Sequence, residues 1–277
     1  MKIAVFSDVQ GNLPAMQTVV EHIRRWDPDL VVMNGDLVNR GPSSDRCLEL
    51  FLQLRDEAGW LPVRGNHEDY VLHCSDNEPD STLDLDMRRF ADWTARQLGP
   101  LAESLRDWPD HLCLHGPADD WLHCTHGSMA GNRIGISASI ADEDLAPRVP
   151  SDVHLFVVAH THKPLEREYQ GVRILNVGSA GSPFDEDPRA SYPQIEHRHG
   201  RWQTRIVRLD YDRDQTERDF RQSGFLDEGG PLARFIFEEW RRARLMMPHF
   251  RERYRQPLLA GELDLHTAVE RFLAQVD

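Results

Sequence analysis

Short apolar runs that end in Asp, Asn or His recur along the chain. Residues 3–6 form the first run, which is followed by Ser7, Asp8 and a polar turn that contains glycine. A run of this length, closed by turn residues, predicts a buried β-strand. The same pattern returns at residues 30–36, 62–68, 122–127 and 155–162. Because ligands bind outside the carboxyl ends of strands in open α/β sheets, these polar ends are predicted to meet in one crevice.

The segments between the first predicted strands have apolar residues at helical spacing. Apolar residues fall on one helix face within residues 13–23 and again within 47–52. Strand and helix thus alternate over residues 1–70, which is typical of an α/β fold with a largely parallel sheet. Further strands are predicted at residues 121–125, 153–159, 172–177, 192–197 and 202–209, with hairpin turns at Gln170-Gly171 and His199-Gly200.

Two segments depart from this alternation. Residues 76–120 carry amphipathic stretches at 83–98 and 101–108, and they are predicted to form a helical insertion beside the site. The chain becomes helical and highly charged after residue 211. These changes predict a main domain of residues 1–211 and a helical C-terminal extension of residues 212–277.

The arginine-rich part of this extension, residues 241–255, has several interpretations. It could bind an anionic partner, or it could be a solvated face that pairs with acidic residues. Its apolar side, with Trp240, Leu245, Met246 and Phe250, could instead dock on the main domain or form a homo-oligomer contact. The sequence leaves these alternatives open.

Composition narrows the classes of function. The chain has 277 residues and a formal net charge of −14, which disfavours non-specific binding to nucleic acid or to an anionic membrane. No apolar run reaches the ~20 residues of a membrane span, and the N-terminus enters a strand without a signal-peptide pattern. The four cysteines form no CxxC pair, so we expect a reducing, cytoplasmic location.

Six residues at the predicted strand ends carry side chains that bind divalent metals. They are Asp8, Asp36, Asn66, His126, His160 and His162. Carboxylate, imidazole and amide oxygen donors suit hard or borderline ions. Two carboxylates that face one crevice would repel each other without cations. Two ions roughly 3.5–4 Å apart, bridged by a carboxylate, can clamp a phosphate and activate water.

The motifs that hold these residues resemble, in order, those of the calcineurin-like metallophosphoesterases. They are Asp8-x-Gln10, Gly35-Asp36, Gly65-Asn66-His67-Glu68, His126-Gly127 and Ala159-His160-Thr161-His162. Residues 176–183 and 188–192 further resemble the small bacterial YfcE-like branch. The resemblance covers residues 1–210. It implies an α/β fold, a four-layer α/β/β/α sandwich, to which this chain adds the helical insertion and the C-terminal extension.

The resemblance also implies a dinuclear centre and roles for its residues. It places Asp8 and His162 on the first ion, Asn66, His126 and His160 on the second, and Asp36 between them. His67 would lie by the leaving-group oxygen while a metal-bound hydroxide attacks phosphorus in line. We expect two divalent ions, Mn²⁺ first, with Fe, Ni and Zn as alternatives.

Two arginines match a narrower set of relatives. The run from Gly35 to Gly41, together with Arg64, is similar to protein phosphatases and diadenosine tetraphosphatases. That similarity implies that Arg40 and Arg64 hold substrate phosphate, a role that suits a bidentate guanidinium. The alternative is that both arginines pair with acidic neighbours.

Two positions depart from the family pattern. Gln10 stands where the family usually has His, and Asn39 stands where the phosphatase-like members have Asp. Gln10 could be a weak metal ligand, a hydrogen-bonding neighbour of one, or neither, so the first ion could bind less tightly. Asn39 can hydrogen-bond the His67 ring but cannot stabilise an imidazolium by charge.

These observations predict a metal-dependent phosphohydrolase that acts on phosphomonoesters or phosphodiesters. Its expected partner is a small phosphorylated substrate, not a membrane, and the C-terminal helices could form a homo-oligomer. One alternative is a phosphoprotein or dinucleoside polyphosphate phosphatase. Another is a non-catalytic binding or scaffold protein that keeps a weakened metal site, an alternative prompted by Gln10 and Asn39.

Overall fold

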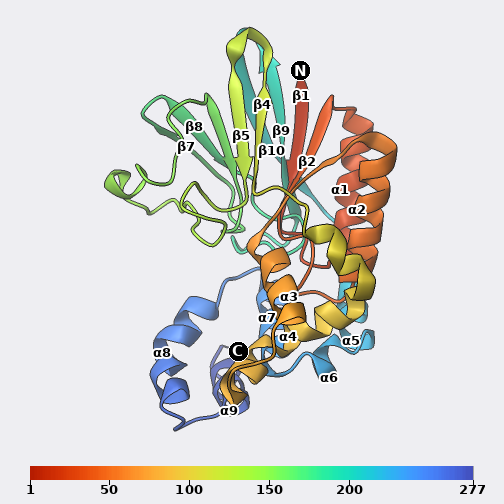
Figure 1. Cartoon of the computed structure of the whole chain (residues 1–277), viewed down its shortest axis with the longest axis vertical. Coiled ribbons are helices and arrows are strands. Elements are labelled where there is room, and N and C mark those ends of the chain that lie inside the picture. Colours follow the sequence, from red (N-terminus) through yellow and green to blue (C-terminus); the bar gives the residue numbers. More distant parts are fainter. Residues whose placement is uncertain (277) are drawn as a thin grey trace.

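The computed structural model describes residues 1–276 and contains two five-stranded β-sheets (Figure 1). The first sheet has the strand order β10-β9-β1-β2-β3. Its strands are β1 (Lys2–Phe6), β2 (Leu30–Asn34), β3 (Leu61–Val63), β9 (Ala190–Arg198) and β10 (Arg201–Leu209). Strands β1, β2 and β3 pair in parallel, whereas β9 and β10 run antiparallel to their neighbours.

The second sheet has the strand order β4-β5-β6-β8-β7. Its strands are β4 (His111–His115), β5 (Trp121–Thr125), β6 (Leu155–Val158), β7 (Leu165–Tyr169) and β8 (Val172–Asn176). Both predicted hairpins are confirmed, because β7 pairs antiparallel with β8 and β9 with β10. Gln170 and His199 have φ angles of 49° and 53°, and a glycine with positive φ follows each. This is the conformation of a tight type I′ turn.

Strand β4 corrects the predicted helical insertion of residues 76–120. Residues 111–115 pair antiparallel with β5 as an edge strand. Leu112 and Leu114 pack against the core between the sheets, while the three residues that alternate with them are exposed. A period of two defines a strand, and this local alternation outweighs the helical character of the preceding residues. The helical part of the insertion therefore ends before residue 111.

Alternate faces of the strands contribute to different cores, which creates the layers of the sandwich. Ile3 and Val5 of β1 face Leu155, Val157 and other residues of the second sheet. On the opposite face of β1, Ala4 and Phe6 lie beneath two helices, α1 (Leu13–Trp26) and α2 (Ser44–Ala58). These helices cover the outer face of the first sheet (Figure 1). The α/β sandwich prediction is confirmed.

The outer face of the second sheet is covered by the segment between β5 and β6. Ile136 and Leu145 of this segment are buried against Phe156, Val158 and Ile174 of the sheet. The segment contains a short 3-10 turn at Asp142–Asp144. The fourth layer is thus largely irregular chain, in contrast to the two long helices over the first sheet.

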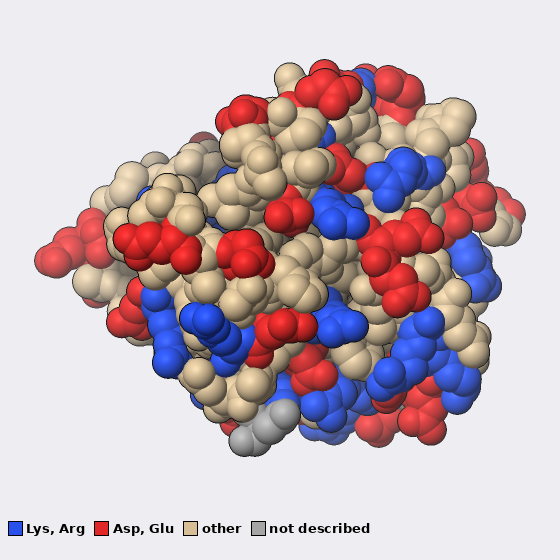
Figure 2. Space-filling model, turned by 90° about the horizontal axis from the view of Figure 1, so that it is seen from below, with Lys and Arg blue, Asp and Glu red and all other residues tan. Residues whose placement is uncertain are grey.

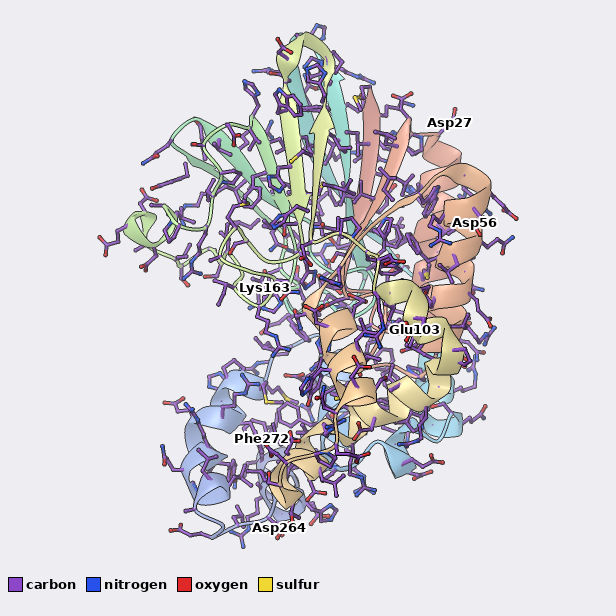
Figure 3. The ribbon with its side chains drawn as sticks, in the orientation of Figure 1. Asp27, Asp56, Glu103, Lys163, Asp264 and Phe272 are labelled. Atoms are coloured by element: carbon purple, nitrogen blue, oxygen red, sulfur yellow. The ribbon has the colours of Figure 1, made fainter. Side chains whose placement is uncertain are left out.

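Helices of the insertion and of the C-terminal extension share a further core below the sheets (Figure 1). They are α4 (Thr82–Leu98), α5 (Arg213–Gln222), α6 (Phe225–Glu228), α7 (Pro231–Arg242), α8 (Met247–Leu259) and α9 (Leu265–Leu273), together with α3 (Asn66–Asp76), which directly precedes the insertion. A 3-10 helix at Gly99–Leu105 follows α4 and packs in the core beneath α1 and α2. Trp93 of α4 packs edge-on against Phe225, with 5.1 Å between ring centroids. Phe235 of α7 and Phe272 of α9, the latter labelled in Figure 3, lie 5.5 Å apart between ring centroids.

The apolar side of the extension is therefore buried within the chain itself. Trp240, Met246 and Phe250 are each at most 3% exposed in this core, which matches the docking alternative raised by their sequence. Arg241 and Arg242 both contact Glu238, as expected of a solvated face that pairs with acidic residues. Among the described residues, no helix combines the length and the apolar run that a membrane crossing requires.

Candidate metal centre

The six predicted ligands lie where the carboxyl ends of both sheets meet the start of α3. Asp8 follows β1, Asp36 follows β2, and the residues from β5 and β6 arrive from the opposite sheet. Asp8, Asp36, His160 and His162 all have φ angles between 54° and 67°, a region that costs free energy for a residue with a Cβ. Strained turns of this kind cluster at functional sites because the surrounding structure holds them in place.

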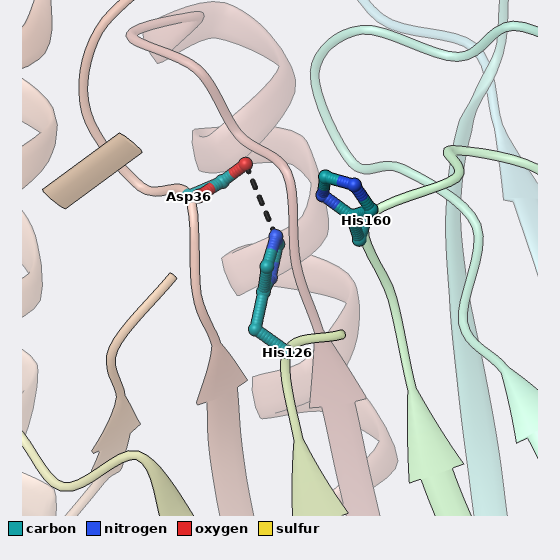
Figure 4. Close-up of side chains that lie close together, drawn as sticks. All are labelled: Asp36, His126 and His160. Carbon is teal, nitrogen blue, oxygen red and sulfur yellow. Dashed lines mark ion pairs between the residues drawn. The ribbon is translucent and has the colours of Figure 1, made fainter. Parts of the chain in front are cut away.

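Their ligand atoms form two overlapping groups. One group is Asp36, His126 and His160, and the other is Asp8, Asp36 and His162, with the atoms of each group within 4.8 Å of one another. His126 Nε2 lies 3.1 Å from Asp36 Oδ2, and the His160 ring faces this pair (Figure 4). His162 Nε2 lies 3.1 Å from Asp8 Oδ1. Asp36 belongs to both groups, which is the position of a carboxylate that could bridge two ions.

Within the described part of the chain, three buried polar atoms at this point lack a hydrogen-bond partner. They are Asp8 Oδ1, Asn66 Oδ1 and His126 Nε2. Leaving a buried polar atom unsatisfied costs about 1–3 kcal/mol, and more for a charged group. All three are oxygen or nitrogen atoms that coordinate divalent ions. The residues present therefore fit a bound metal, which would satisfy these atoms.

Backbone carbonyls set the orientation of two imidazoles. His126 Nδ1 lies 2.8 Å from Asn34 O, and His162 Nδ1 hydrogen-bonds Ser182 O. A carbonyl oxygen only accepts, so each Nδ1 carries a proton and Nε2 of each ring is directed toward the centre. Outer hydrogen bonds of this type commonly hold metal-binding histidines in position.

The local charges favour a cation at this position. Although burial opposes ionisation of Asp36, His126 and His67 hold its pKa well below the usual range. Burial likewise lowers the pKa of His126, but Asp36 and Asp8 outweigh it and raise that pKa to about 10. Without a metal, the two carboxylates therefore stabilise a proton on His126. A divalent ion can supply the same positive charge.

Glu68 organises the loop that carries Asp36, and the sequence assigned it no role. Its fully buried carboxylate accepts hydrogen bonds from the backbone N–H groups of Gly65, Asp36, Leu37 and Val38, at 2.8–3.2 Å. Glu68 is the third residue of α3, where an acidic side chain commonly caps the preceding backbone. The spacing Gly65-x-x-Glu68 is the sequence pattern that could have indicated this role of Glu68.

Asn39 fixes the tautomer of His67. The backbone N–H of Arg40 donates to Asn39 Oδ1 at 2.9 Å, so Nδ2 is the atom that lies 3.0 Å from His67 Nδ1. An amide nitrogen donates, and His67 Nδ1 must therefore accept and leave the proton on Nε2. Thr94 of α4 also donates to Asn39 Oδ1, at 3.2 Å. Burial lowers the pKa of His67 to about 3, which keeps the ring neutral.

Arg40 and Gln10 form a chain of contacts with the C-terminal extension. Arg40 Nε donates to Gln10 Oε1 at 3.0 Å, and its Nη2 donates to Glu239 Oε2 of α7 at 2.6 Å. Gln10 Nε2 in turn lies 3.3 Å from His162 Nε2. Because guanidinium N–H groups only donate, the Gln10 oxygen faces Arg40 and its nitrogen faces His162. Metal ligation by Gln10, which needs the oxygen, stays a prediction.

Glu239 of α7 contacts the site although it lies outside every motif of the sequence. Its carboxylate is fully buried and also accepts the backbone N–H groups of Met246 and Met247 at 2.7 and 2.9 Å. It thereby anchors Arg40 from a position 199 residues away in the chain. The sequence pattern that could have indicated this contact is an amphipathic helix with one acidic residue on its apolar face.

Arg64 takes a different position from Arg40. Its guanidinium hydrogen-bonds Asp110 Oδ1 and the Arg106 carbonyl, and it lies 3.1 Å from Asp69 Oδ1. It does not line the cavity beside the metal ligands. The structure therefore places Arg64 among acidic neighbours, which was the alternative to phosphate binding.

A cavity of about 680 Å³ opens beside the ligand groups. Its polar end is formed by Asp36, Asn66, His67, His160 and His162, with Gln10 and Arg40 beside them. Residues of α3, α4, α7 and α8 form much of the opposite side. The side chains brought together by the two sheets thus face a space that can hold a small molecule.

Comparisons with known proteins agree with this geometry. Residues 1–170 match the family model described as calcineurin-like phosphoesterase. A symmetrical bis(5′-nucleosyl)-tetraphosphatase of Pseudomonas syringae is 38% identical over 74 residues, which span 26% of this chain and only 24% of that protein. An uncharacterized protein of Methanocaldococcus jannaschii is 27% identical over 76% of this chain and 88% of its own length.

Solved structures share the fold over a larger part of the chain. The crystal structure of a metallophosphoesterase from Sphaerobacter thermophilus has a TM-score of 0.66 and 25% identity, and the match covers 88% of this chain and all of that one. A hypothetical protein from Pyrococcus horikoshii has a TM-score of 0.71, with 18% identity over 84% of this chain and 97% of its own. The second likeness concerns the fold alone.

Proposed function

Because the chain belongs to the calcineurin-like phosphoesterase family, we propose that it is a metal-dependent phosphohydrolase that cleaves phosphomonoesters or phosphodiesters. The observation that carries this proposal is the pair of ligand groups that share Asp36. The unpartnered Asp8 Oδ1, Asn66 Oδ1 and His126 Nε2 support it, because a cation would satisfy all three.

The residues divide naturally between two divalent ions. Asp8 and His162 would hold one ion, His126, His160 and Asn66 the other, and Asp36 would contact both. When bound, such ions supply Lewis acidity and neutralise the charge of the phosphoester. The mixture of nitrogen and oxygen donors supports Mn²⁺ as the first candidate, with Fe, Ni and Zn as alternatives.

His67 is proposed to donate a hydrogen bond from Nε2 to the substrate. It lines the cavity, and Asn39 occupies its Nδ1 as a donor. The neutral ring then stabilises charge on the departing oxygen by a hydrogen bond, but it is a weak acid. We therefore expect this protein to favour phosphoesters with good leaving groups.

Arg40 is proposed to face substrate phosphate from the edge of the cavity. It lines the cavity while Glu239 and Gln10 hold its guanidinium. A guanidinium fixed in this way loses little conformational freedom when it contacts an anion. The positions of Nε and Nη2 are taken by these partners, so phosphate would be met by the remaining N–H donors.

A small phosphorylated molecule fits this cavity better than a phosphoprotein does. The cavity lies within the usual range of about 300–1,000 Å³ for small-molecule sites, and apolar side chains line one side. Because 74 residues of the chain are similar to a bis(5′-nucleosyl)-tetraphosphatase, dinucleoside polyphosphates are a second candidate class of substrate. The unpaired cysteines support the proposed cytoplasmic location, and a homo-oligomer through the C-terminal helices stays a proposal.

The test is hydrolysis by protein that has been stripped of metal and reloaded with Mn²⁺. The panel would include an aryl phosphate, a bis-aryl phosphodiester, nucleotides and a phosphopeptide, with Asp36→Asn as the matched inactive control. We expect metal-dependent release of phosphate or alcohol from at least one small substrate. Absence of hydrolysis across the panel, with few ions bound, would favour the scaffold alternative.

A further inference from the structure

The wall of the cavity opposite the metal ligands is apolar and is formed largely by the C-terminal extension. Its side chains include Tyr70, Phe90, Leu232, Ile236, Leu245 and Met247. The last four lie in α7, in α8 or between them, beyond the residues 1–170 that match the family model. Aromatic rings, methionine and branched aliphatic side chains together suit a flat apolar group.

Three further residues give the same cavity a positive charge. Arg133, Lys163 and Arg251 line it from three separate segments. Lys163, labelled in Figure 3, lies between the second sheet and the C-terminal helices. Within residues 1–276, none of the three has an acidic side chain within ion-pair distance. Their charges are thus open to a ligand, in contrast to Arg40.

This lining differs from the rest of the surface. The chain has 46 acidic and 32 basic residues, and both signs are intermixed on the face shown in Figure 2. Among the described residues that line the cavity, Asp36 is the only acidic one, and it belongs to the metal centre. An acidic protein that excludes carboxylates from one cavity, and leaves cations unpaired there, is suited to an anionic ligand.

We infer that this cavity binds the non-reacting part of the substrate, namely an aromatic group of nucleobase size together with a second anionic group. The inference rests on the proposed hydrolase function and names its substrate class: a phosphoester with an aromatic group and at least one additional negative charge. The apolar wall takes the ring, and Arg133, Lys163 and Arg251 take the second anion. Specificity thus comes from the apolar wall and these three cations, and the reaction takes place at the strand ends.

Three matched probes separate these contributions. Ribose 5-phosphate lacks the base, adenosine 5′-monophosphate has it, and adenosine 3′,5′-bisphosphate adds a second phosphate. Affinities would be measured by calorimetry on the full chain with the catalytically impaired Asp36→Asn substitution, and kcat/KM on the wild type. We expect each added group to tighten binding by roughly tenfold, about the size of one buried ring or one charged contact.

Substitutions then test which residues bind the second phosphate and which bind the base. Arg251→Gln and Lys163→Gln should each remove most of the bisphosphate advantage, while Leu245→Ser should remove most of the advantage of the base. Arg255→Gln and Leu259→Ser are the controls, because both residues are exposed on α8 and outside the cavity. Thermal unfolding of each variant verifies that it is folded.

The outcomes distinguish the two proposals. Hydrolysis of a simple aryl phosphate without discrimination among the three probes overturns the cavity inference and leaves the hydrolase function intact. Graded binding that follows the substitutions, without hydrolysis of any phosphoester, supports the cavity as an anion site and overturns the hydrolase function. Equal losses in Arg251→Gln and Arg255→Gln also overturn the inference, because the effect would then be one of net charge.

Discussion

The metal end and the apolar wall of the cavity are built in opposite ways. The metal end uses residues that directly follow buried strands, and backbone groups fix their orientation, as Asn34 and Ser182 do for His126 and His162. The apolar wall uses residues from the insertion and the extension, which depend on packing between helices far apart in sequence. The metal-ligating side chains are thus positioned by the ends of the sheets, and the opposite wall of the cavity is positioned by a separate helical layer.

Arg40 and Glu239 join these two regions. Arg40 belongs to the loop after β2, and Glu239 belongs to α7. Their ion pair is buried on both sides, with the side chains 11% and 0% exposed. A substitution at the metal end should therefore change catalysis, and a substitution in the apolar wall should change substrate selection. A substitution at the Arg40–Glu239 ion pair should affect both regions.

Asp36→Asn should have the largest effect, because it removes the carboxylate shared by both ligand groups. We expect kcat to fall by about a thousandfold, with a reduced metal content, since charge stabilisation at the reacting phosphate is lost. Steady-state kinetics and elemental analysis on the same sample check this. A variant that keeps its full metal content and most of its rate would show that the chemistry does not depend on the strand ends.

Glu239→Ala should have the next largest effect, on stability and activity together. The substitution leaves the Arg40 guanidinium buried beside Gln10 alone and removes the acceptor of the Met246 and Met247 N–H groups. We expect the free energy of unfolding to fall by about 3 kcal/mol, with a higher KM. Denaturant unfolding and kinetics measure both.

Glu238→Ala is the matched control for that change. Glu238 is the preceding residue of α7 and pairs with Arg241 and Arg242 at the surface. Exposed ion pairs contribute about 0–1 kcal/mol, so its unfolding free energy should change little. Similar losses of unfolding free energy in Glu238→Ala and Glu239→Ala would mean that the buried Arg40–Glu239 ion pair has no special role.

Asn39→Asp should change the pH dependence at the metal end without affecting the apolar wall. In the wild type, burial lowers the pKa of His67 to about 3, so the ring stays neutral over roughly pH 5–8 and its protonation does not affect the rate. An aspartate at this position accepts from Nδ1–H, favours the charged ring and raises that pKa.

For a substrate with a poor leaving group, the carboxylate introduced by Asn39→Asp should increase kcat by about tenfold at low pH. The gain should disappear as pH rises through the new pKa, because the ring then loses its proton. A pH–rate profile with an alkyl phosphate, and one with an aryl phosphate as the insensitive control, measures this. Identical profiles for both proteins would show that His67 does not act on the leaving group.

Arg64→Gln should have the smallest effect. Arg64 contacts Asp110 and Asp69 outside the cavity, and we expect KM to stay within about twofold of the wild type. Arg40→Gln is the contrasting variant and should raise KM by roughly tenfold. A sharp rise in KM for Arg64→Gln would restore the phosphate-binding role that the sequence suggested.

The sequence predicted those features that depend on neighbouring residues. Asp8, Asp36 and His126 each follow a strand whose apolar run is visible, so their convergence followed from the topology of α/β sheets. The hairpins at 170–171 and 199–200 followed from turn chemistry. Strand β4 was missed because only two leucines mark it, beside a long helical stretch.

Features that depend on distant residues could not be predicted in the same way. Glu239 appeared as one acidic residue of a charged helix, and only the packing of α7 places it on Arg40. The orientation of the Gln10 amide likewise depends on this guanidinium. A single sequence does not specify which helix face meets which loop, because many arrangements bury the same apolar residues.

The most direct measurement is the metal content of the protein with and without Asp36, determined together with hydrolysis. The wild type, reloaded with Mn²⁺ and freed of excess ion, should hold two ions per chain, as its two ligand groups imply, and should hydrolyse an aryl phosphate. Asp36→Asn should lose metal and hydrolysis together. Full hydrolysis by metal-stripped wild-type protein, or a wild type that retains no ion, would contradict a shared metal centre at the strand ends.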